Sequence, residues 1–294
     1  MKVLGFGDNI IDWFVDRSIV YPGGNSVNFA VFARQLGVEA SYLGVFGSDA
    51  GGAFLRQSIS SEGVDLSHSA VRAGKSGVST LTVIDGERTF GGWNGGGVTV
   101  SKPLQLDDEL LAYVADFDLV HSSVYSRSEP ELPKLRKTRT LVSFDLSSED
   151  EFRSADYLDR VVPFADLVLF SCSDLSPAQT RSLLTDGVAR GAGLALGTRG
   201  TKGAIAYDGR CFVEGVAQPL EDPSLIVDTM GCGDAFLTAF AVTLLRTGWS
   251  RRKPPSADAI SAALRGGAGF AASQCLVEGA FGHGTDDSLV PATM

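Results

Sequence analysis

An acidic residue stands between a glycine-rich turn and a long apolar run in the stretch VDTMGCGDAF, at residues 227–236. The run from Ala235 to Leu245 has helical spacing and LIVDT before the turn has strand composition, so a strand-to-helix turn is expected. The first N–H groups of such a helix are unpaired, and with the helix dipole they favour an anion such as a phosphoryl group. Asp234 would stay ionised at this positive end and accept a proton from a substrate hydroxyl. The alternative is that Asp234 simply caps the helix.

Polar side chains also follow the first expected strand and open the first expected helix. GFGDNIIDWF carries two acids and an amide, and YPGGNSVNFA carries a glycine pair and two amides. Carboxylates and amides hydrogen-bond to adjacent sugar hydroxyls, and glycines let the backbone approach a ligand closely. Solvated turn acids and an ordinary capped helix are the alternatives. The candidate ligand-binding residues are Asp8, Asn9, Asp12, Gly24, Asn25 and Asn28.

Short apolar segments with strand composition alternate along the chain with segments of helical periodicity. Strands are expected at 2–6, 41–46, 118–123, 140–146, 165–171, 193–198 and 225–229. Helices are expected at 26–36, 52–62, 107–114, 178–190 and 235–245. This alternation predicts an α/β fold with a mainly parallel central sheet flanked by helices, in a single domain over residues 1–294. Ligands of such sheets bind beyond the C-terminal ends of the strands, where the polar residues fall.

Two segments depart from the alternation and are typical of β-hairpins. GVSTLTVIDGERTFGGW turns at residues 85–86, and AIAYDGRCFVEGV has the same Asp-Gly turn signal. The first hairpin, with WFVDRSIVYPG, is expected to form a small β lid from about 12–22 and 76–100. Phe90 and Trp93 are candidates for apolar contacts between this lid and a substrate, or for ordinary packing.

Charge and composition narrow the class of function. The chain has 25 basic and 35 acidic residues, a formal net charge of −10 and no stripe of Lys and Arg, which disfavours nucleic acid as a partner. No apolar run reaches the ~20 residues of a membrane span, so no membrane partner is expected and the cytoplasm is the expected location. The four cysteines lie far apart, without the spacing of zinc sites or redox dithiols.

The string around Asp234 resembles the C-terminal signature of the ribokinase-like, or PfkB, carbohydrate kinases, D-T-x-G-A-G-D. Five of the six specified positions match, and Cys stands where the family has Ala. The resemblance implies phosphorylation of a sugar hydroxyl by ATP, with Asp234 as general base in a turn formed by Gly231, Cys232 and Gly233. The Gly-Gly-Asn stretch resembles the other signature of the family. This implies a sugar pocket lined by Gly24, Asn25 and Asn28 and gripped by Asp12, with Asp8, Asn9 and Phe90 nearby.

The resemblance also implies sites for ATP and Mg²⁺. In LALGTRGTKGA, the residues expected to contact the nucleotide are Thr198, Gly200 and Gly203. These glycines are no Rossmann fingerprint, because a strand rather than a helix is expected after them. Relatives have Asn-x-x-Glu where this chain has Ser171 and Asp174. Asp174 could act on Mg²⁺ through a water molecule, or it could be a plain surface acid.

The resemblance narrows the substrate as well. Within the family, the combination of GDNIID, GGNSVNFA, DLVHSS and RTFGGW looks most like the kinases that phosphorylate fructoselysine, a sugar–amino acid adduct, at its C6 hydroxyl. Ribose, fructose and other ketoses remain open. Two other classes also remain: a non-catalytic sugar- or nucleotide-binding regulatory protein of the same fold, and a nicotinamide-dependent oxidoreductase, for which the N-terminal glycine loop is lacking.

Further expectations concern single residues and assembly. The resemblance suggests K⁺ near the carbonyls around Asp228 and within residues 271–282, and a homodimer formed through the lid hairpins. Asp145 ends an expected strand and would point into the cleft. For His121, a structural role is favoured over contact with the substrate.

Overall fold

A nine-stranded sheet forms the centre of the computed structural model, which describes residues 1–84, 87–220 and 222–290. Seven strands run parallel, and an antiparallel hairpin closes one edge. In spatial order the strands are β13 (Phe212–Gly215), β12 (Ala204–Tyr207), β11 (Leu194–Thr198), β10 (Leu167–Ser171), β9 (Leu141–Asp145), β8 (Leu119–Ser123), β1 (Lys2–Gly7), β4 (Glu39–Gly47) and β5 (Ala70–Arg72). The mainly parallel sheet predicted from the sequence is confirmed.

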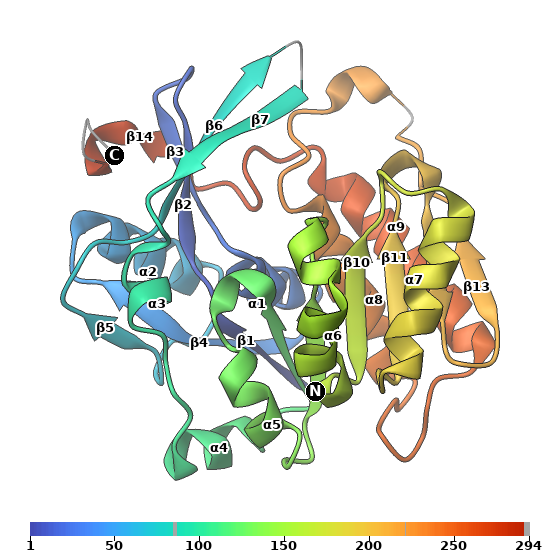
Figure 1. Ribbon diagram of the computed structural model, residues 1–294. Coiled ribbons are helices and arrows are strands. Elements are labelled where there is room, and N and C mark those ends of the chain that lie inside the picture. The colour runs from blue at the N-terminus through green and yellow to red at the C-terminus, as the bar shows by residue number, and fades with distance from the viewer. Residues whose placement is uncertain (85–86, 221, 291–294) are drawn as a thin grey trace.

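Helices cover both faces of this sheet (Figure 1). Side chains alternate along each strand, so Val3 packs into one core and Leu4 and Phe6 into the other. The first core also contains residues of α1 (Asn25–Gln35), α2 (Ala50–Ser61), α8 (Cys232–Arg246) and α9 (Ala257–Gln274). The second contains residues of α4 (Asp108–Val114), α5 (Leu132–Leu135), α6 (Ala155–Val161) and α7 (Pro177–Ala189). A short α-helix, α3, spans Gly97–Ser101. Short 3-10 helices occupy Val124–Ser126, Glu129–Glu131, Asp150–Arg153, Val162–Phe164, Gly200–Lys202, Pro223–Leu225 and Asp287–Leu289.

A second sheet of five strands stands outside the central one. Its order is β14 (Thr285–Asp286), β3 (Ile19–Gly23), β2 (Ile10–Phe14), β6 (Val78–Ile84) and β7 (Glu87–Trp93). Only Asp8 and Asn9 separate β1 of the large sheet from β2 of the small one, so both residues lie where the sheets meet. The small sheet was expected, but not its strand β14 from the C-terminal segment. The expected Asp-Gly turn at 85–86 lies outside the described residues.

In the C-terminal third one expected element is wrong and one helix was missed. No strand forms at 225–229: Leu225, Ile226 and Val227 are exposed, and the Val227 N–H donates to the carbonyl of Cys275 at 2.9 Å instead of to a neighbouring strand. The turn before Asp234 therefore follows an irregular segment. Helix α9 was not expected, and its buried face mixes Ile260 and Leu264 with the small residues Ala263, Gly267 and Ala268. A Cβ on Gly267 would lie 2.9 Å from a carbonyl of α8, so glycine there permits close helix packing.

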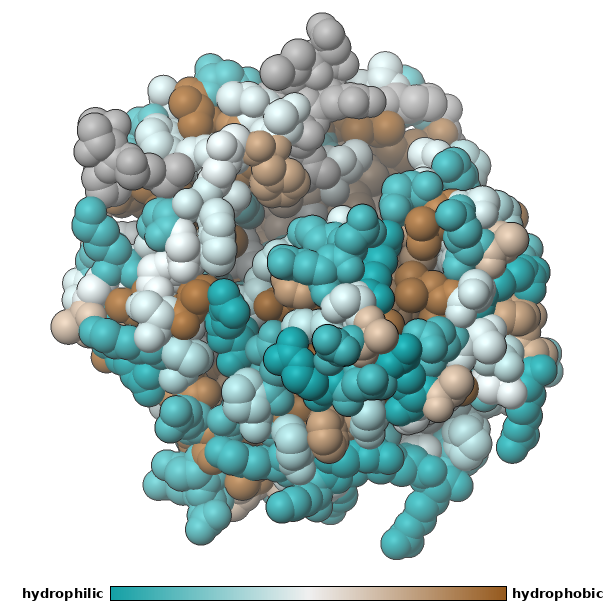
Figure 2. Space-filling model, in the orientation of Figure 1, coloured by the Kyte–Doolittle hydropathy of each residue, from teal (hydrophilic) through white to brown (hydrophobic). Residues whose placement is uncertain are grey.

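The exterior in the view of Figure 2 is mostly hydrophilic, with apolar side chains scattered among polar ones. Within the described part of the chain, none of the helices combines the length and the apolar character that crossing a membrane requires.

Candidate active site

The carboxylate of Asp234 is held by two amides from the start of α1. Asn25 Nδ2 donates to Asp234 Oδ1 at 3.0 Å, and Asn28 Nδ2 donates to Oδ2 at 2.8 Å. The two asparagines lie one turn apart on α1, so both side chains reach the first turn of α8. Asp234 is 9% exposed and Asn28 is 4% exposed. The structure thus joins the two sequence stretches that were predicted to form one site.

The turn before Asp234 leaves two backbone donors open. Gly231 has φ 70°, which a glycine adopts without strain, and a Cβ there would lie 2.9 Å from Ala280 Cβ. Among the described residues, none accepts a hydrogen bond from the backbone N–H of Gly233 or Asp234. A Cβ on Gly233 would meet no atom within 4 Å. Among the described residues, packing therefore gives no reason for a glycine here, and the Cβ position faces open space that a ligand could enter.

The thiol of Cys232 in this turn lies against the thiol of another cysteine. Cys232, which opens α8, has its Sγ atom 3.2 Å from the Sγ of Cys275 at the end of α9. The two cysteines are far apart in sequence, so their spacing gave no sign of this contact. Both are reduced thiols in the structure.

The electrostatics of Asp234 differ from the expectation that the helix end keeps it ionised. Burial raises the pKa of Asp234 well above its usual value, and the negative charges of Asp145 and Asp8 raise it further. Asn25 Nδ2 also donates to Asp145 Oδ2 at 2.9 Å, so one amide bridges the two carboxyl groups. Burial raises the pKa of Asp145 to about 7. Desolvation and like charges outweigh the helix dipole here, which makes Asp234 a stronger base than an exposed aspartate.

Asp8 is fixed by hydroxyl groups, and Asn9 is tied to the fold. Asp8 Oδ1 accepts hydrogen bonds from the hydroxyls of Ser26, Ser123 and Ser126 at 2.8, 3.0 and 2.6 Å. Asn9 Nδ2 donates to Tyr42 Oη and to the carbonyl of Val45, both at 2.8 Å. The amide nitrogen of Asn9 is therefore used within the protein, and its Oδ1 atom, buried without a partner among the described residues, is the group it can offer.

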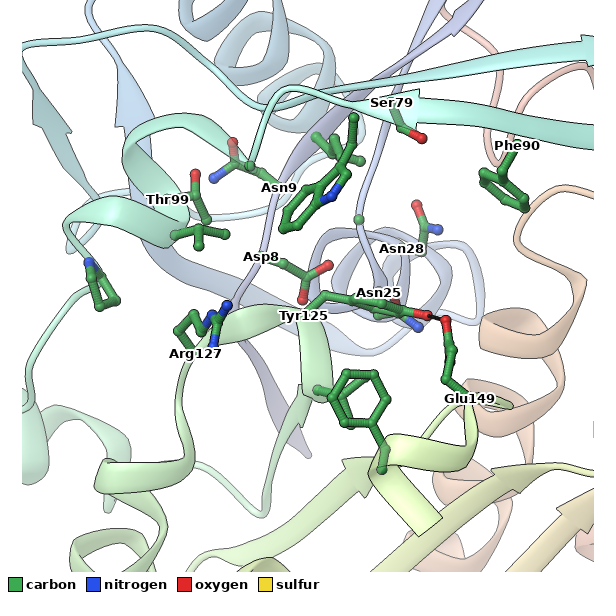
Figure 3. A pocket seen from close by; sticks show the side chains of 18 of the residues that line it. Asp8, Asn9, Asn25, Asn28, Ser79, Phe90, Thr99, Tyr125, Arg127 and Glu149 are labelled. Carbon is green, nitrogen blue, oxygen red and sulfur yellow. Dashed lines mark hydrogen bonds between the residues drawn. The ribbon is translucent and has the colours of Figure 1, made fainter. Parts of the chain in front are cut away.

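A cavity of about 1220 Å³ lies where the two sheets meet, and it joins most of the predicted sugar-binding residues (Figure 3). Asp12 enters it from β2, opposite a glycine: a Cβ on Gly23 would lie 2.2 Å from Asp12 Oδ2. Figure 2 shows the surface hollowed beneath the small sheet. The predicted residues that line the cavity are Asp8, Asn9, Asp12, Gly24, Asn25, Asn28, Phe90, Trp93 and Asp234.

The opposite wall of the cavity was missed by the sequence analysis. It carries Tyr125 and Arg127 from the segment after β8, and Glu149 from the segment after β9. Tyr125 Oη donates to Glu149 Oε1 at 2.5 Å and lies 2.7 Å from Ser147 Oγ (Figure 3). Residues after the C-terminal ends of parallel strands are favoured for ligand contact, and that rule could have selected them.

His121 is a core residue and does not line the cavity. It is fully buried, its ring packs 4.7 Å from that of Phe29, and its Nδ1 lies 3.1 Å from Ser143 Oγ. Burial lowers its pKa to about 3, so the imidazole is neutral. The favoured structural role is consistent with this environment.

The residues predicted to contact the nucleotide lie together, but outside this cavity. Ser171 and Thr198 are register partners at the ends of β10 and β11, on the edge of the sheet where Asp145 ends β9. Gly200 and Gly203 follow β11 with φ 56° and 85°, and a Cβ on Gly203 would lie 2.1 Å from the carbonyl of Gly215. The glycines therefore have a structural role, and their contact with a nucleotide stays a prediction.

Asp174 is engaged by an arginine. Its carboxylate accepts hydrogen bonds from Arg153 at 3.0 and 3.2 Å, and this guanidinium also donates to the carbonyl of Ser171 at 2.5 Å. In the described part of the chain, no group of three or more His, Cys, Asp or Glu side chains is arranged to hold a metal ion. As it stands, Asp174 does not fit the expected role toward Mg²⁺.

Comparison with known proteins identifies the kind of chain that builds this site. Residues 16–281 match the sequence model of the pfkB family of carbohydrate kinases. Fructosamine kinase FrlD of Bacillus subtilis (strain 168) is 37% identical over 289 residues, which cover 97% of this chain and 94% of the relative. Fructoselysine 6-kinase of Escherichia coli (strain K12) is 32% identical over 251 residues, 85% of this chain and 90% of the relative. Arabidopsis thaliana ribokinase, solved with ribose and ATP, superposes with a TM-score of 0.73 at 18% identity over 95% of this chain and 93% of the neighbour, so the fold is ribokinase-like.

Proposed function

The chain belongs to the pfkB family and is a carbohydrate kinase, and from this premise we propose that it transfers the γ-phosphoryl group of ATP to the C6 hydroxyl of a fructosamine such as fructoselysine. Asp234 would act as the general base. The proposal on the substrate rests on the two relatives that act on fructosamines, each more than 30% identical over most of both chains.

One observation carries the role of Asp234: a buried carboxylate with a raised pKa lines the cavity beside two open backbone N–H groups. Each carboxylate oxygen can accept about two hydrogen bonds, and Asn25 and Asn28 use one on each. An acceptor site therefore remains for a substrate hydroxyl. Phosphoryl transfer needs such orientation, a base for the hydroxyl and donors for the transferring oxygens.

The nucleotide is proposed to lie beside Ser171 and Thr198. These two residues share the edge of the sheet with Asp145, and ATP is present in the ribokinase neighbour. Mg²⁺ would accompany the nucleotide and neutralise charge on its phosphates. We assign it no ligand in this chain, because the Asp174 carboxylate is paired with Arg153.

A K⁺ ion near Asp228 belongs to the same proposal. The structure brings the two predicted segments together, since Gly279 N–H donates to Asp228 Oδ2 at 3.1 Å and the N–H of Val227 donates to the carbonyl of Cys275. Turnover should therefore be faster in K⁺ than in Na⁺ buffer, and equal rates would remove this ion from the account.

The small sheet is proposed to act as a lid and as a dimer surface. Its residues Ser79 and Phe90 line the cavity, and Phe90 and Trp93 are 66% and 53% exposed. Large exposed apolar side chains on one strand favour association. Light scattering should give the mass of a dimer, and a monomer at working concentration would argue against this part.

The test of the main proposal is a panel of acceptors with the wild type and Asp234→Asn. ADP release is measured with fructoselysine, fructose and ribose, and the phosphorylated product is located by mass spectrometry. The variant should lose about 10² to 10⁴-fold in kcat with fructoselysine. It should fold normally, because Asn28 Oδ1 has no partner among the described residues and could accept from the new amide after a flip. Near-normal turnover by the variant would exclude Asp234 as the base, and sugar binding without ADP release by the wild type would indicate a non-catalytic binding protein.

A further inference from the structure

Three kinds of surface line the cavity. Asp8, Asp12 and Asp234 form a polar, acidic part. Trp93, Val100 and Val124 add an apolar stretch. The far wall carries charged side chains of both signs. A sugar fits the first surface and an alkyl chain the second, but neither requires the third.

Arg127 stands out on the far wall. It lines the cavity, and among the described residues its guanidinium has neither an ion pair nor a hydrogen bond. Its backbone has φ 53°, an uncommon conformation for a residue with a side chain. The turn that imposes this conformation is tightly built, because a Cβ on Gly7 would lie 2.2 Å from Ser126 Cβ. The backbone of Arg127 is thus fixed by the fold, while its exposed guanidinium has no ion-pair partner among the described residues.

Glu149 supplies the opposite charge. Tyr125 Oη donates to one of its oxygens, which fixes the carboxylate at the cavity. Figure 3 shows Arg127 and Glu149 on opposite sides of Tyr125. Two other charged groups of this wall are engaged: Glu129 accepts from Tyr157 Oη at 2.7 Å, and the Arg160 guanidinium lies 5.1 Å from the centre of the Tyr157 ring. Glu151 also lines the cavity.

We propose that Arg127 and Glu149 recognise the charged α-amino acid head of the substrate, Arg127 binding its carboxylate and Glu149 its ammonium group. The inference rests on the proposed function, because it takes the sugar end to be at Asp234. A guanidinium matches the planar geometry of a carboxylate, and hydrogen bonds between charged groups are stronger than neutral ones. The apolar side chains that line the same cavity, Trp93, Val100 and Val124, suit the methylene groups of a lysine side chain. The substrate class is therefore a ketose joined through an alkyl chain to a free amino acid.

Three synthetic acceptors separate these contacts. Fructosyl-lysine carries both charged groups, the fructosyl adduct of 6-aminohexanoic acid lacks the α-ammonium, and that of 1,5-diaminopentane lacks the carboxylate. The proteins are the wild type, Arg127→Gln and Glu149→Gln. Arg252→Gln is the matched control, because Arg252 is exposed and does not line the cavity. For each pair kcat and KM are measured, and binding is measured by calorimetry without ATP.

Arg127→Gln should lower kcat/KM about 10- to 100-fold more on the two carboxylate-bearing acceptors than on the carboxylate-free one, mainly through KM. Glu149→Gln should instead lower kcat/KM more on the two ammonium-bearing acceptors than on the acceptor that lacks the ammonium group. Equal losses on all three acceptors, or a wild type indifferent to the carboxylate, would overturn the assignment of Arg127. Calorimetry distinguishes failure of this inference from failure of the proposed function. Binding that depends on the carboxylate, without phosphorylation, would count against the proposed kinase reaction alone. Phosphorylation with no dependence of binding on the carboxylate would count against the recognition of the amino acid head.

Discussion

Replacing Asp145 by Asn should move the acidic limb of the pH–rate profile to lower pH. Asp145 and Asp234 accept hydrogen bonds from the same Asn25 Nδ2 atom, at 2.9 and 3.0 Å, so the two acceptor oxygens are no more than about 6 Å apart. At that distance one negative charge changes the energy of another by about 1 to 3 kcal/mol for effective dielectric constants of about 20 to 40. This corresponds to a shift of about 1 to 2 pH units.

The sign follows from the charge that is removed. The negative charge of Asp145 raises the pKa of Asp234, so an uncharged residue at position 145 makes Asp234 easier to ionise. The base then becomes active at lower pH. Asn25 donates to Oδ2 of Asp145 and the Ser147 N–H donates to Oδ1 at 2.7 Å, so the amide oxygen of an asparagine can keep one of these two bonds. The other donor then faces the new NH2 group, and the substitution removes one local hydrogen bond together with the charge.

The assay is kcat/KM from pH 5 to 9, because this parameter reports ionisations of the free enzyme. Asp116→Asn is the matched control: it removes the same charge from an exposed loop that precedes β8, at the end of the strands opposite the site. An unmoved limb, or one moved to higher pH, would refute the electrostatic coupling of Asp145 and Asp234. Loss of activity at every pH would instead assign Asp145 a direct role with the substrate. The apparent pKa belongs to the carboxyl cluster as a whole, so the shift rather than its absolute position is the test.

Three further substitutions test the turn before α8. Gly233→Ala should leave the melting temperature nearly unchanged, since its Cβ would meet no protein atom, but should lower turnover by obstructing the phosphoryl group. Gly231→Ala should lower the free energy of unfolding by about 1 to 2 kcal/mol, because residue 231 has a positive φ. Equal effects of the two glycine variants on both melting temperature and turnover would contradict these different roles. Cys232→Ala should retain turnover, because the backbone N–H is kept. Hydrogen peroxide should oxidise the two thiols, which lie 3.2 Å apart, to a disulfide and be reduced to water. This treatment should inactivate the wild type but not the Cys232→Ala variant. Equal sensitivity of the two proteins would show that the cysteine pair is not responsible.

The large sheet was predictable because buried parallel strands are continuous apolar runs and the helices between them have an apolar face. The two errors occur where these signals fail. The segment at 225–229 has strand composition, but it lies exposed against the end of α9 and pairs with no strand. The buried face of helix α9 has large apolar residues at Ile260 and Leu264 but continues with Gly267 and Ala268, so its apolar periodicity is weak over the later turns.

The reacting end of the site was predictable from local motifs, whereas its electrostatics were not. Asp234, Asn25 and Asn28 lie in two recognisable stretches, and the fold brings these together. The raised pKa of Asp234 depends on burial and on Asp145, which is separated from Asn25 by 120 positions. No local pattern encodes a contact of that range. The far wall of the cavity was missed for the same reason, because its residues follow two different strands.

Charged side chains of both signs line the cavity, and their arrangement can orient a substrate. The wall with Glu129, Glu149 and Glu151 also carries the cationic Arg127 and Arg160. The other acids are Asp8, Asp12 and Asp234, and Arg127 comes one residue after Ser126, which donates to Asp8 at 2.6 Å. A fructosamine that entered with its amino acid head first would bring a carboxylate among these three acids, where like charges repel it. The neutral polyol end meets no such penalty, so the acids proposed to bind the sugar would also disfavour the reversed orientation. In the proposed complex the C6 hydroxyl is then the group presented to Asp234, and the proposed recognition of the head and the proposed site of phosphorylation follow from one charge pattern.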